Sequence, residues 1–242
     1  MQNPLIVALD VPDAARALHL AETLAPVVGA VKVGKELFVS EGPDIVRHLR
    51  AAGASVFLDL KFHDIPNTVA AAVAAAVRLD VQMLTVHASG GLAMLRAAQD
   101  AAETAARELN RPAPWVLAVT VLTSLDDADL ASVGVAGDAA AQVERLANLA
   151  CTAGLQGLVC SPRELPMLRR ALPRSMRLIT PGIRPAESAA GDQKRTMTPA
   201  EAMEAGADGL VIGRPITLAA DPCEAARRIL ESLLTRPVPS RP

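Results

Sequence analysis

Short runs of aliphatic and β-branched residues recur along this chain, and longer segments rich in alanine and leucine separate them. Strands buried on both faces read as continuous apolar runs, and parallel strands need crossover connections that are usually helical. The pattern predicts a parallel sheet with helical crossovers, and roughly eight runs match the strand number of a (β/α)8 barrel. The predicted strands cover residues 5–9, 30–33, 55–60, 83–87, 115–121, 157–160, 178–180 and 209–212.

Helix signals occupy several of the intervening segments. Asp13 is a good N-terminal cap, Gly154 is a typical residue after a helix end, and Thr198-Pro199 supplies a cap followed by proline at the first helical position. The predicted helices include residues 13–24, 68–79, 138–153 and 199–205.

The chain is predicted to form one domain. A sequence of 242 residues with 51% hydrophobic content can bury one large core, and barrels of this kind commonly have about this length. No linker divides the chain. We therefore predict an α/β fold, a single-domain (β/α)8 TIM barrel over residues 1–234, and a disordered tail over residues 235–242.

Composition argues against several classes of function. A formal net charge of −2 and 2% aromatic content give neither the basic field nor the stacking residues that nucleic-acid binding uses. The three cysteines form no CxxC pair, which argues against a disulfide framework and a thiolate zinc site. The chain has no basic leader and no apolar stretch of about 20 residues. We expect a cytoplasmic protein that binds neither nucleic acid nor membrane.

Polar residues fall repeatedly at the ends of the predicted strands. Barrels of this type do their chemistry at the carboxyl ends of the strands, so side chains there converge on one mouth. Several such residues together favour an active site over isolated structural charges. They are Asp10, Lys32, Asp59, Lys61, His87, Thr123, Ser161, Arg184 and Arg214.

The most informative stretch is Asp59-Leu60-Lys61-Phe62-His63-Asp64, which places charges at the end of an apolar strand. Side chains alternate along a strand, so Asp59 and Lys61 share a face, and Asp64 could close an Asp/Lys/Asp cluster. Buried charges are costly unless they are paired. An ammonium held by carboxylates suits a proton donor that faces a carbanion. The alternative is a salt-bridged strand end, and the hexapeptide alone does not decide between them.

The last two strands suggest a phosphate site. Pro181-Gly182-Ile183-Arg184 and Ile212-Gly213-Arg214-Pro215 each place glycine beside arginine, in the loops where such barrels often hold phosphate. Glycine lets backbone N–H groups approach an anion, and arginine offers a fork of donors. Alternatively the glycines make turns and the arginines are solvated. Residues 185–198 have few apolar side chains, and we predict a mobile lid there.

These fragments, in this order and spacing, resemble the bacterial type of orotidine 5'-phosphate decarboxylase, the enzyme that forms uridine 5'-monophosphate (UMP). The resemblance spans nearly the whole chain. The matching fragments are Ala8-Leu9-Asp10, Val31-Lys32-Val33-Gly34, residues 59–68, Val121-Leu122-Thr123-Ser124, Pro181-Gly182-Ile183-Arg184, residues 191–195 and residues 206–216.

The resemblance implies a role for each matching residue. Lys61 would donate a proton to C6 of the pyrimidine, Asp59 would sit against the departing carboxylate, and Lys32 would complete the charge array while touching the ribose. Asp64 would also belong to the catalytic set, and the segment with Asp64, Ile65 and Thr68 would reach into the neighbouring subunit of a homodimer. The remaining substrate contacts would be Asp10 for the ribose, Thr123 or Ser124 for the pyrimidine, and Arg184, Gln193, Gly213 and Arg214 for the phosphate.

No cofactor and no metal are expected. The chain has neither GxGxxG after a strand nor GxxxxGK[ST]. A fixed ammonium would stabilise charge that develops only in the transition state, and flanking carboxylates favour its charged form.

Two alternatives stay open. The pattern of Asp59, Lys61 and Asp64 also occurs in 3-hexulose-6-phosphate synthases and related sugar-phosphate decarboxylases, which would use Mg²⁺ held by carboxylates. A non-catalytic barrel that senses or stores a phosphorylated ligand is the other. Among the histidines, we predict that His87 is a hydrogen-bonded structural residue, and that His63 points away from Lys61.

Overall fold

The computed structural model describes residues 3–185 and 197–234, which form a closed barrel of eight parallel strands. The strands are β1 (Leu5–Ala8), β2 (Ala30–Val33), β3 (Val56–Phe62), β4 (Met83–His87), β5 (Trp115–Val119), β6 (Gly157–Val159), β7 (Arg177–Thr180) and β8 (Gly209–Ile212). Each strand pairs with the next, and β8 closes the ring by pairing with β1. The predicted barrel is confirmed, and no predicted strand end differs from the observed one by more than two residues.

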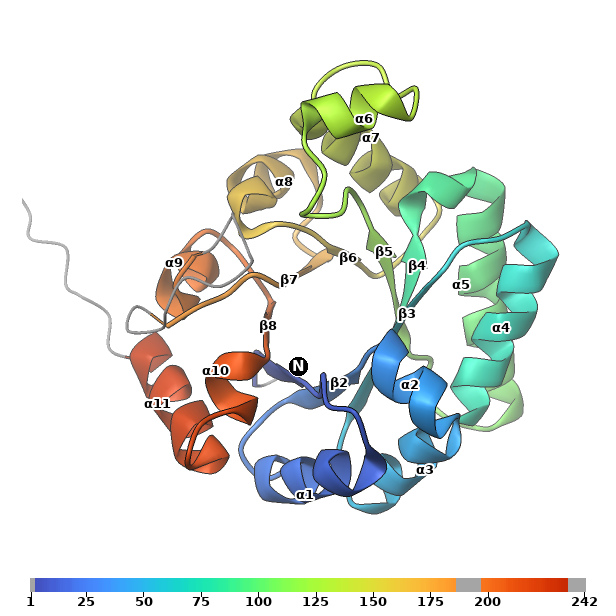
Figure 1. Cartoon of the computed structure of the whole chain (residues 1–242). Coiled ribbons are helices and arrows are strands. Elements are labelled where there is room, and N and C mark those ends of the chain that lie inside the picture. Colours follow the sequence, from blue (N-terminus) through green and yellow to red (C-terminus); the bar gives the residue numbers. More distant parts are fainter. Residues whose placement is uncertain (1–2, 186–196, 235–242) are drawn as a thin grey trace, which may run out of the picture.

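Helices form a ring around the barrel (Figure 1). They are α1 (Ala14–Leu24), α2 (Lys35–Glu41), α3 (Asp44–Ala51), α4 (Pro66–Arg78), α5 (Gly91–Glu108), α6 (Asp127–Ser132), α7 (Ala139–Thr152), α8 (Leu165–Ala171), α9 (Pro199–Glu204), α10 (Arg214–Thr217) and α11 (Pro222–Leu234), with 3-10 turns η1 (Ala88–Gly90) and η2 (Pro162–Glu164). The four predicted helices correspond to α1, α4, α7 and α9. The tail, residues 235–242, lies outside the described residues.

The predicted cap residues lie at the ends of three helices, α1, α7 and α9. The Asp13 side chain accepts a hydrogen bond from the Arg16 backbone N–H at 2.8 Å, which satisfies a free donor of α1. Thr198 and Glu201 form a reciprocal capping box at the start of α9. Gly154 follows α7 with a φ of 84°, a backbone conformation that glycine adopts without steric cost.

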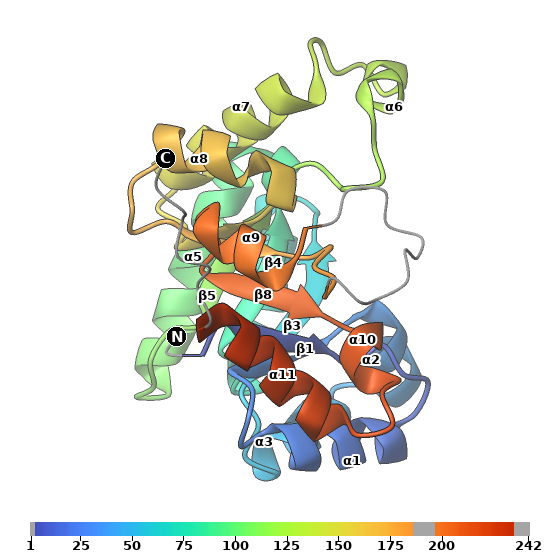
Figure 2. The same cartoon turned by 90° about the vertical axis from the view of Figure 1, so that its left-hand side faces the viewer.

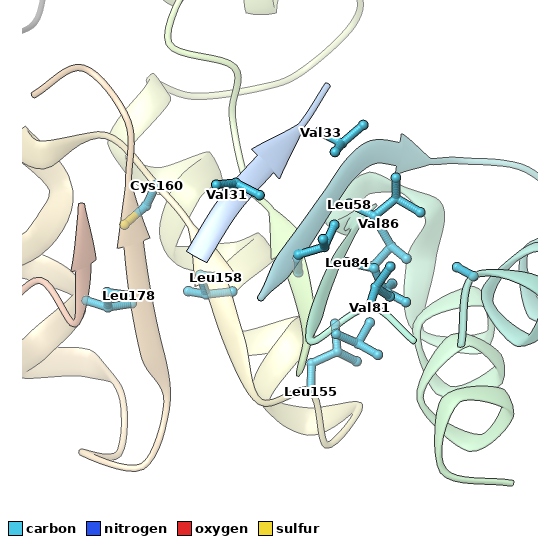
Figure 3. Packing of buried hydrophobic residues seen from close by; sticks show 14 of the residues in the cluster. Val31, Val33, Leu58, Val81, Leu84, Val86, Leu155, Leu158, Cys160 and Leu178 are labelled. Atoms are coloured by element: carbon cyan, nitrogen blue, oxygen red, sulfur yellow. The ribbon is translucent and has the colours of Figure 1, made fainter. Parts of the chain in front are cut away.

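The core has two layers because successive strand residues point to opposite faces. Inside the barrel, one cluster contains strand residues only, among them Ile6, Ala8, Phe57 and Leu117. Outside it, the alternate strand residues pack against the apolar faces of the helices. Figure 3 shows part of this outer layer, with Val31 and Val33 of β2 beside Leu58 of β3 and Leu84 and Val86 of β4.

A cation–π pair lies at the amino-terminal mouth of the barrel, where β5 and β7 begin. The Arg177 guanidinium carbon lies 4.0 Å from the centroid of the Trp115 ring. Gly157 of the intervening β6 leaves room for this pair, since a Cβ there would lie 2.7 Å from the Arg177 carbonyl oxygen. A side chain at Gly157 would push β6 and β7 apart.

The opposite mouth receives the carboxyl ends of the strands. Figure 2 shows β1 and β8 pointing toward the end of the barrel where α2, α6 and α10 lie. Within residues 3–185 and 197–234, no helix combines the length and apolar character needed to cross a membrane.

Candidate active site

Four charged side chains alternate in sign at the carboxyl ends of β1, β2 and β3. The Lys32 Nζ lies 3.1 Å from Asp10 Oδ1 and 3.7 Å from Asp59 Oδ2. The Lys61 Nζ lies 2.8 Å from each carboxylate oxygen of Asp59. Two carboxylates and two ammonium groups therefore compensate each other, which buried charges require. The structure brings together four of the charged residues that we predicted for this mouth.

Asp59 is largely buried, with 13% of its side chain exposed, close to the 11% of Lys32. Burial alone would raise the pKa of the Asp59 carboxyl. The charges of Lys32 and Lys61, with hydrogen bonds from Lys61 and Thr85, outweigh burial and hold the pKa below its usual value. Asp59 is therefore ionised at neutral pH.

The end of β3 is irregular where it carries the array. Leu58 pairs with Leu84 and Phe62 with Val86, so residues 59–61 of β3 lie opposite the single residue Thr85 of β4. Such a bulge bends a strand and redirects its side chains. Lys61 adopts a φ of 57°, in the left-handed region that residues with a side chain seldom occupy. The charged residues thus share a face through a bulge and not through regular alternation.

Thr85 joins the two halves of the Asp59/Lys61 pair and was missed in the sequence. Its hydroxyl oxygen accepts from the Lys61 backbone N–H at 2.9 Å and donates to Asp59 Oδ1 at 2.9 Å. The side chain is fully buried on β4. A signal was available, because Thr85 is a polar residue two positions before His87, on the same face of a predicted strand.

A cavity of about 180 Å³ opens beside the charge array. Its charged wall contains Lys32, Asp59 and Lys61, and Thr123 also lines it, whereas Ser124 does not. The other lining residues are Phe57, Val119, Val121, Leu122, Val159, Cys160, Pro181 and Val211. A planar ring could lie against this apolar surface with one edge toward the charges.

A larger cavity, about 310 Å³, lies at the other mouth of the barrel and includes Trp115 and Asp80 in its lining. Asp80 is already paired with Arg50 at 2.8 Å and with Arg111 at 3.4 Å. The larger volume of this cavity therefore does not make it the candidate active site. The smaller cavity is the candidate because the charge array faces it.

Two glycines lie beside the array. A Cβ on Gly34 would lie 3.1 Å from Lys32 Nζ and 3.3 Å from Asp10 Oδ1, closer than ordinary side-chain contacts. A Cβ on Gly213 would lie 3.9 Å from Asp10 Oδ2. Gly213, predicted for the phosphate site, is therefore a neighbour of Asp10.

The phosphate-site residues are only partly described. Arg214 is exposed at the start of α10, and Arg184 lies in the loop after β7. The Arg184 backbone N–H donates to the Met197 carbonyl at 3.0 Å, and Ile183 pairs with Met197. Gln193 and most of the predicted lid lie outside the described residues.

The segment after β3 carries the three residues that we predicted to reach a neighbouring subunit. Asp64, Ile65 and Thr68 are exposed, and the Asp64 carboxylate accepts from the Ile65 backbone N–H at 2.6 Å. Among the described residues, no ion pair joins Asp64 to Lys61. The local Asp/Lys/Asp cluster that the hexapeptide suggested therefore does not form within one chain.

Ser161 and His87, the other two polar residues at strand ends, contact neighbouring protein groups. Ser161 is fully buried, and its backbone N–H donates to Glu164 at 2.9 Å. Among the described residues no side-chain hydrogen bond involves the His87 ring, and its predicted hydrogen bond stays a prediction. Its ring instead faces the exposed His63, with centroids 5.5 Å apart. Burial, then the charges of His63, Lys61 and Lys35, lower the pKa of His87, and Asp59 opposes them.

Across residues 3–185 and 197–234, no group of three or more His, Cys, Asp and Glu side chains is arranged to hold a metal ion. The carboxylates of Asp10 and Asp59 both face the ammonium of Lys32. Lysine thus occupies the position between carboxylates that a divalent cation would need.

Known proteins share this sequence and architecture. Residues 3–229 match the family described as "Orotidine 5'-phosphate decarboxylase / HUMPS family". The chain is 54% identical to the orotidine 5'-phosphate decarboxylase of Dichelobacter nodosus, covering 96% of this chain and 99% of that protein. It is 55% identical to the enzyme of that name from Moorella thermoacetica, covering 94% and 91%. The crystal structure of orotidine 5'-phosphate decarboxylase from Lactobacillus acidophilus superposes with a TM-score of 0.86 at 39% identity, covering 96% of this chain and 99% of that one.

Proposed function

The chain belongs to the orotidine 5'-phosphate decarboxylase / HUMPS family, and we infer that it is a carboxy-lyase that converts orotidine 5'-phosphate to UMP and CO2 in pyrimidine nucleotide biosynthesis. The observation that carries this conclusion is the buried Asp59/Lys61 pair facing an apolar cavity. The pair offers a negative group and a proton donor to the same edge of a bound ring.

In the proposed reaction the bond between C6 and its carboxylate breaks, and CO2 leaves. The electron pair stays on C6 and takes a proton from the Lys61 ammonium, so C6 gains a hydrogen and Lys61 becomes neutral until solvent reprotonates it. Asp59 lies beside the departing carboxylate, and their repulsion is relieved when the charge leaves as CO2. Lys61 stabilises charge that appears only in the transition state, which is the kind of interaction that raises the rate.

The remaining site residues hold the nucleotide. Asp10 and Lys32 contact the ribose, and Thr123 contacts the pyrimidine. Lys32 and Thr123 line one cavity, Asp10 is paired with Lys32, and Gly213 lies near Asp10. These positions support a ligand that spans the mouth from β3 to β8. The phosphate contacts come from Arg184, Gln193, Gly213 and Arg214.

The active enzyme is a homodimer with shared sites. Asp64, Ile65 and Thr68 of one subunit reach the cavity of the other. Two observations support this: the Ile65 side chain is 67% exposed and so is accessible to a second subunit, and Asp64 forms no ion pair with Lys61 among the described residues of its own chain. The enzyme works in the cytoplasm, which the free thiols of Cys151, Cys160 and Cys223 support.

Incubation of the purified protein with orotidine 5'-phosphate tests the proposed function. We expect the ultraviolet absorbance of the substrate to fall while UMP and CO2 form in equal amounts. A protein that left this substrate unchanged but acted with Mg²⁺ on 3-hexulose 6-phosphate would overturn the conclusion. Lys32 between the two carboxylates favours the first outcome.

A further inference from the structure

We propose that Thr85 is a positioning residue for the decarboxylation, and that its hydroxyl fixes both the backbone of Lys61 and the carboxylate of Asp59. This inference rests on the proposed function of Asp59 and Lys61. The geometry of the charge array would then depend on a residue of the neighbouring strand β4, which contributes no charge to the array.

The two hydrogen bonds of Thr85 have a fixed direction. A backbone N–H can only donate, so at Lys61 the hydroxyl uses a lone pair. Its single proton is then available for Asp59 Oδ1, 2.9 Å away. Thr85 is completely buried, so water does not compete for either bond. The Lys61 N–H therefore donates to the Thr85 hydroxyl, and that hydroxyl donates to Asp59, which must be an acceptor.

The bulge explains why a side chain is needed at this place. Residues 59–61 lie opposite Thr85 alone, so the regular ladder between β3 and β4 is interrupted there. The Lys61 N–H finds the threonine hydroxyl as its partner. A left-handed residue with a side chain persists only where surrounding contacts hold it. The hydroxyl supplies such a contact at the residue that carries the proton donor.

Thr85 also acts on the charge of Asp59. The groups that face Asp59 are Lys32 from β2, Lys61 from its own strand, and Thr85 and, more remotely, His87 from β4. Burial raises the pKa of Asp59, and the two lysines and the hydrogen bonds from Lys61 and Thr85 lower it. Removal of the hydroxyl should therefore raise that pKa and loosen the carboxylate that Lys61 contacts.

The test compares Thr85→Val, which keeps the shape and removes the hydroxyl, with Thr85→Ser, which keeps the hydroxyl. Loss of one buried hydrogen bond to a charged group predicts a fall in kcat of about 10- to 100-fold in Thr85→Val. Affinity for UMP should change by less than about threefold, because UMP lacks the carboxylate that Asp59 faces. The acid limb of the kcat profile should move to higher pH. Thr85→Ser should restore kcat and the acid limb.

Thr180→Val is the matched control. Thr180 is as fully buried as Thr85, and its hydroxyl donates to the Cys160 carbonyl at 2.7 Å, outside the charge array. We expect Thr180→Val to lose stability with little change in kcat. Equal losses of kcat in Thr85→Val and Thr180→Val, or an unchanged acid limb in Thr85→Val, would overturn the proposal. If Thr85→Val does not fold, Thr85→Cys, whose thiol is a weak donor, is expected to show the same changes.

A measurement without turnover separates this inference from the proposed function. The carboxyl carbon of Asp59 can be followed by ¹³C NMR and assigned with Asp59→Asn. We expect its pKa to rise in Thr85→Val and to return in Thr85→Ser. An unchanged titration in an active enzyme would overturn the role of Thr85. A shifted titration in a protein that leaves orotidine 5'-phosphate intact would uphold that hydrogen bond and overturn the proposed function.

Discussion

The ammonium of Lys61 lies 2.8 Å from both carboxylate oxygens of Asp59, the residue two positions earlier on β3. The contact is made at a bulged strand end, with Lys61 in a left-handed conformation. With substrate bound, the carboxylate on C6 would approach Asp59 while Lys61 turns toward C6. In the resting site each of these two charges thus has a partner of opposite sign.

Replacement of Lys61 by alanine tests the proton donor directly. We expect Lys61→Ala to lower kcat at least about 1,000-fold, because both the proton donor and the fixed positive charge are lost. UMP should still bind, since its C6 already carries hydrogen. Lys35→Ala is the control, because Lys35 is exposed at the start of α2, outside the array. Turnover of Lys61→Ala near the wild-type rate would remove Lys61 from its role.

Mixed dimers test whether Asp64 serves the partner's site. Lys61→Ala and Asp64→Ala are each expected to be inactive. After co-refolding, about half of the dimers are mixed, and each mixed dimer contains one intact site, so roughly a quarter of the wild-type activity should return. Recovery is measured as initial rate per total protein.

The same experiment has an internal control. Asp59 and Lys61 lie on one strand of one subunit, so a mixture of Lys61→Ala with Asp59→Asn should regain nothing. Asp64 would belong to the site of its own subunit if the first mixture also stayed inactive while gel filtration showed dimers.

Chelation tests the expectation that no metal takes part. After treatment with excess EDTA and removal of the chelate, we expect kcat and KM to stay within about twofold of the untreated enzyme, because lysine ammonium groups supply the positive charge. The measurement is the initial rate with and without added Mg²⁺. Activity that disappears on chelation and returns with Mg²⁺ would contradict the expectation.

His87 is predicted to make stability depend on pH. Burial and neighbouring positive charges lower its pKa in the folded protein, whereas the unfolded chain has the ordinary value of about 6.5. As pH falls below about 6.5, His87 takes up a proton more readily in the unfolded state than in the folded state. The free energy of unfolding therefore decreases with falling pH until the lowered pKa of the folded state has been passed. Urea unfolding at pH 7, 6 and 5 should show a smaller decrease for His87→Gln than for wild type. His19→Gln, at an exposed position of α1, should show the same decrease as wild type. Equal decreases in all three proteins would contradict the prediction.

Much of the fold could be predicted because periodicity and caps are local. The strands at residues 30–33, 83–87 and 209–212 are read directly from apolar runs bounded by turns, and the structure has the same ends. The charged strand ends of β2 and β3 were also predictable, since parallel strands in a barrel all deliver their carboxyl ends to one mouth.

The remainder depends on contacts between strands. The bulge at Lys61 follows from the pairing of β3 with β4, which no local pattern encodes. The sequence places the polar Thr85 on the same face as His87, but its partners, Lys61 and Asp59, are known only from the structure. The absence of a hydrogen bond at His87 within the described residues likewise depends on which groups the fold leaves near it.

The Trp115/Arg177 pair at the amino-terminal mouth has a spectroscopic consequence. The chain contains one tryptophan and no tyrosine, so its near-ultraviolet fluorescence comes from a single indole. That indole lies under a guanidinium at the opposite mouth from the charge array. Tryptophan emission, excited at the red edge of the absorption band, should therefore change when the barrel unfolds and should not change when a nucleotide binds. It can then be used to follow unfolding with substrate present.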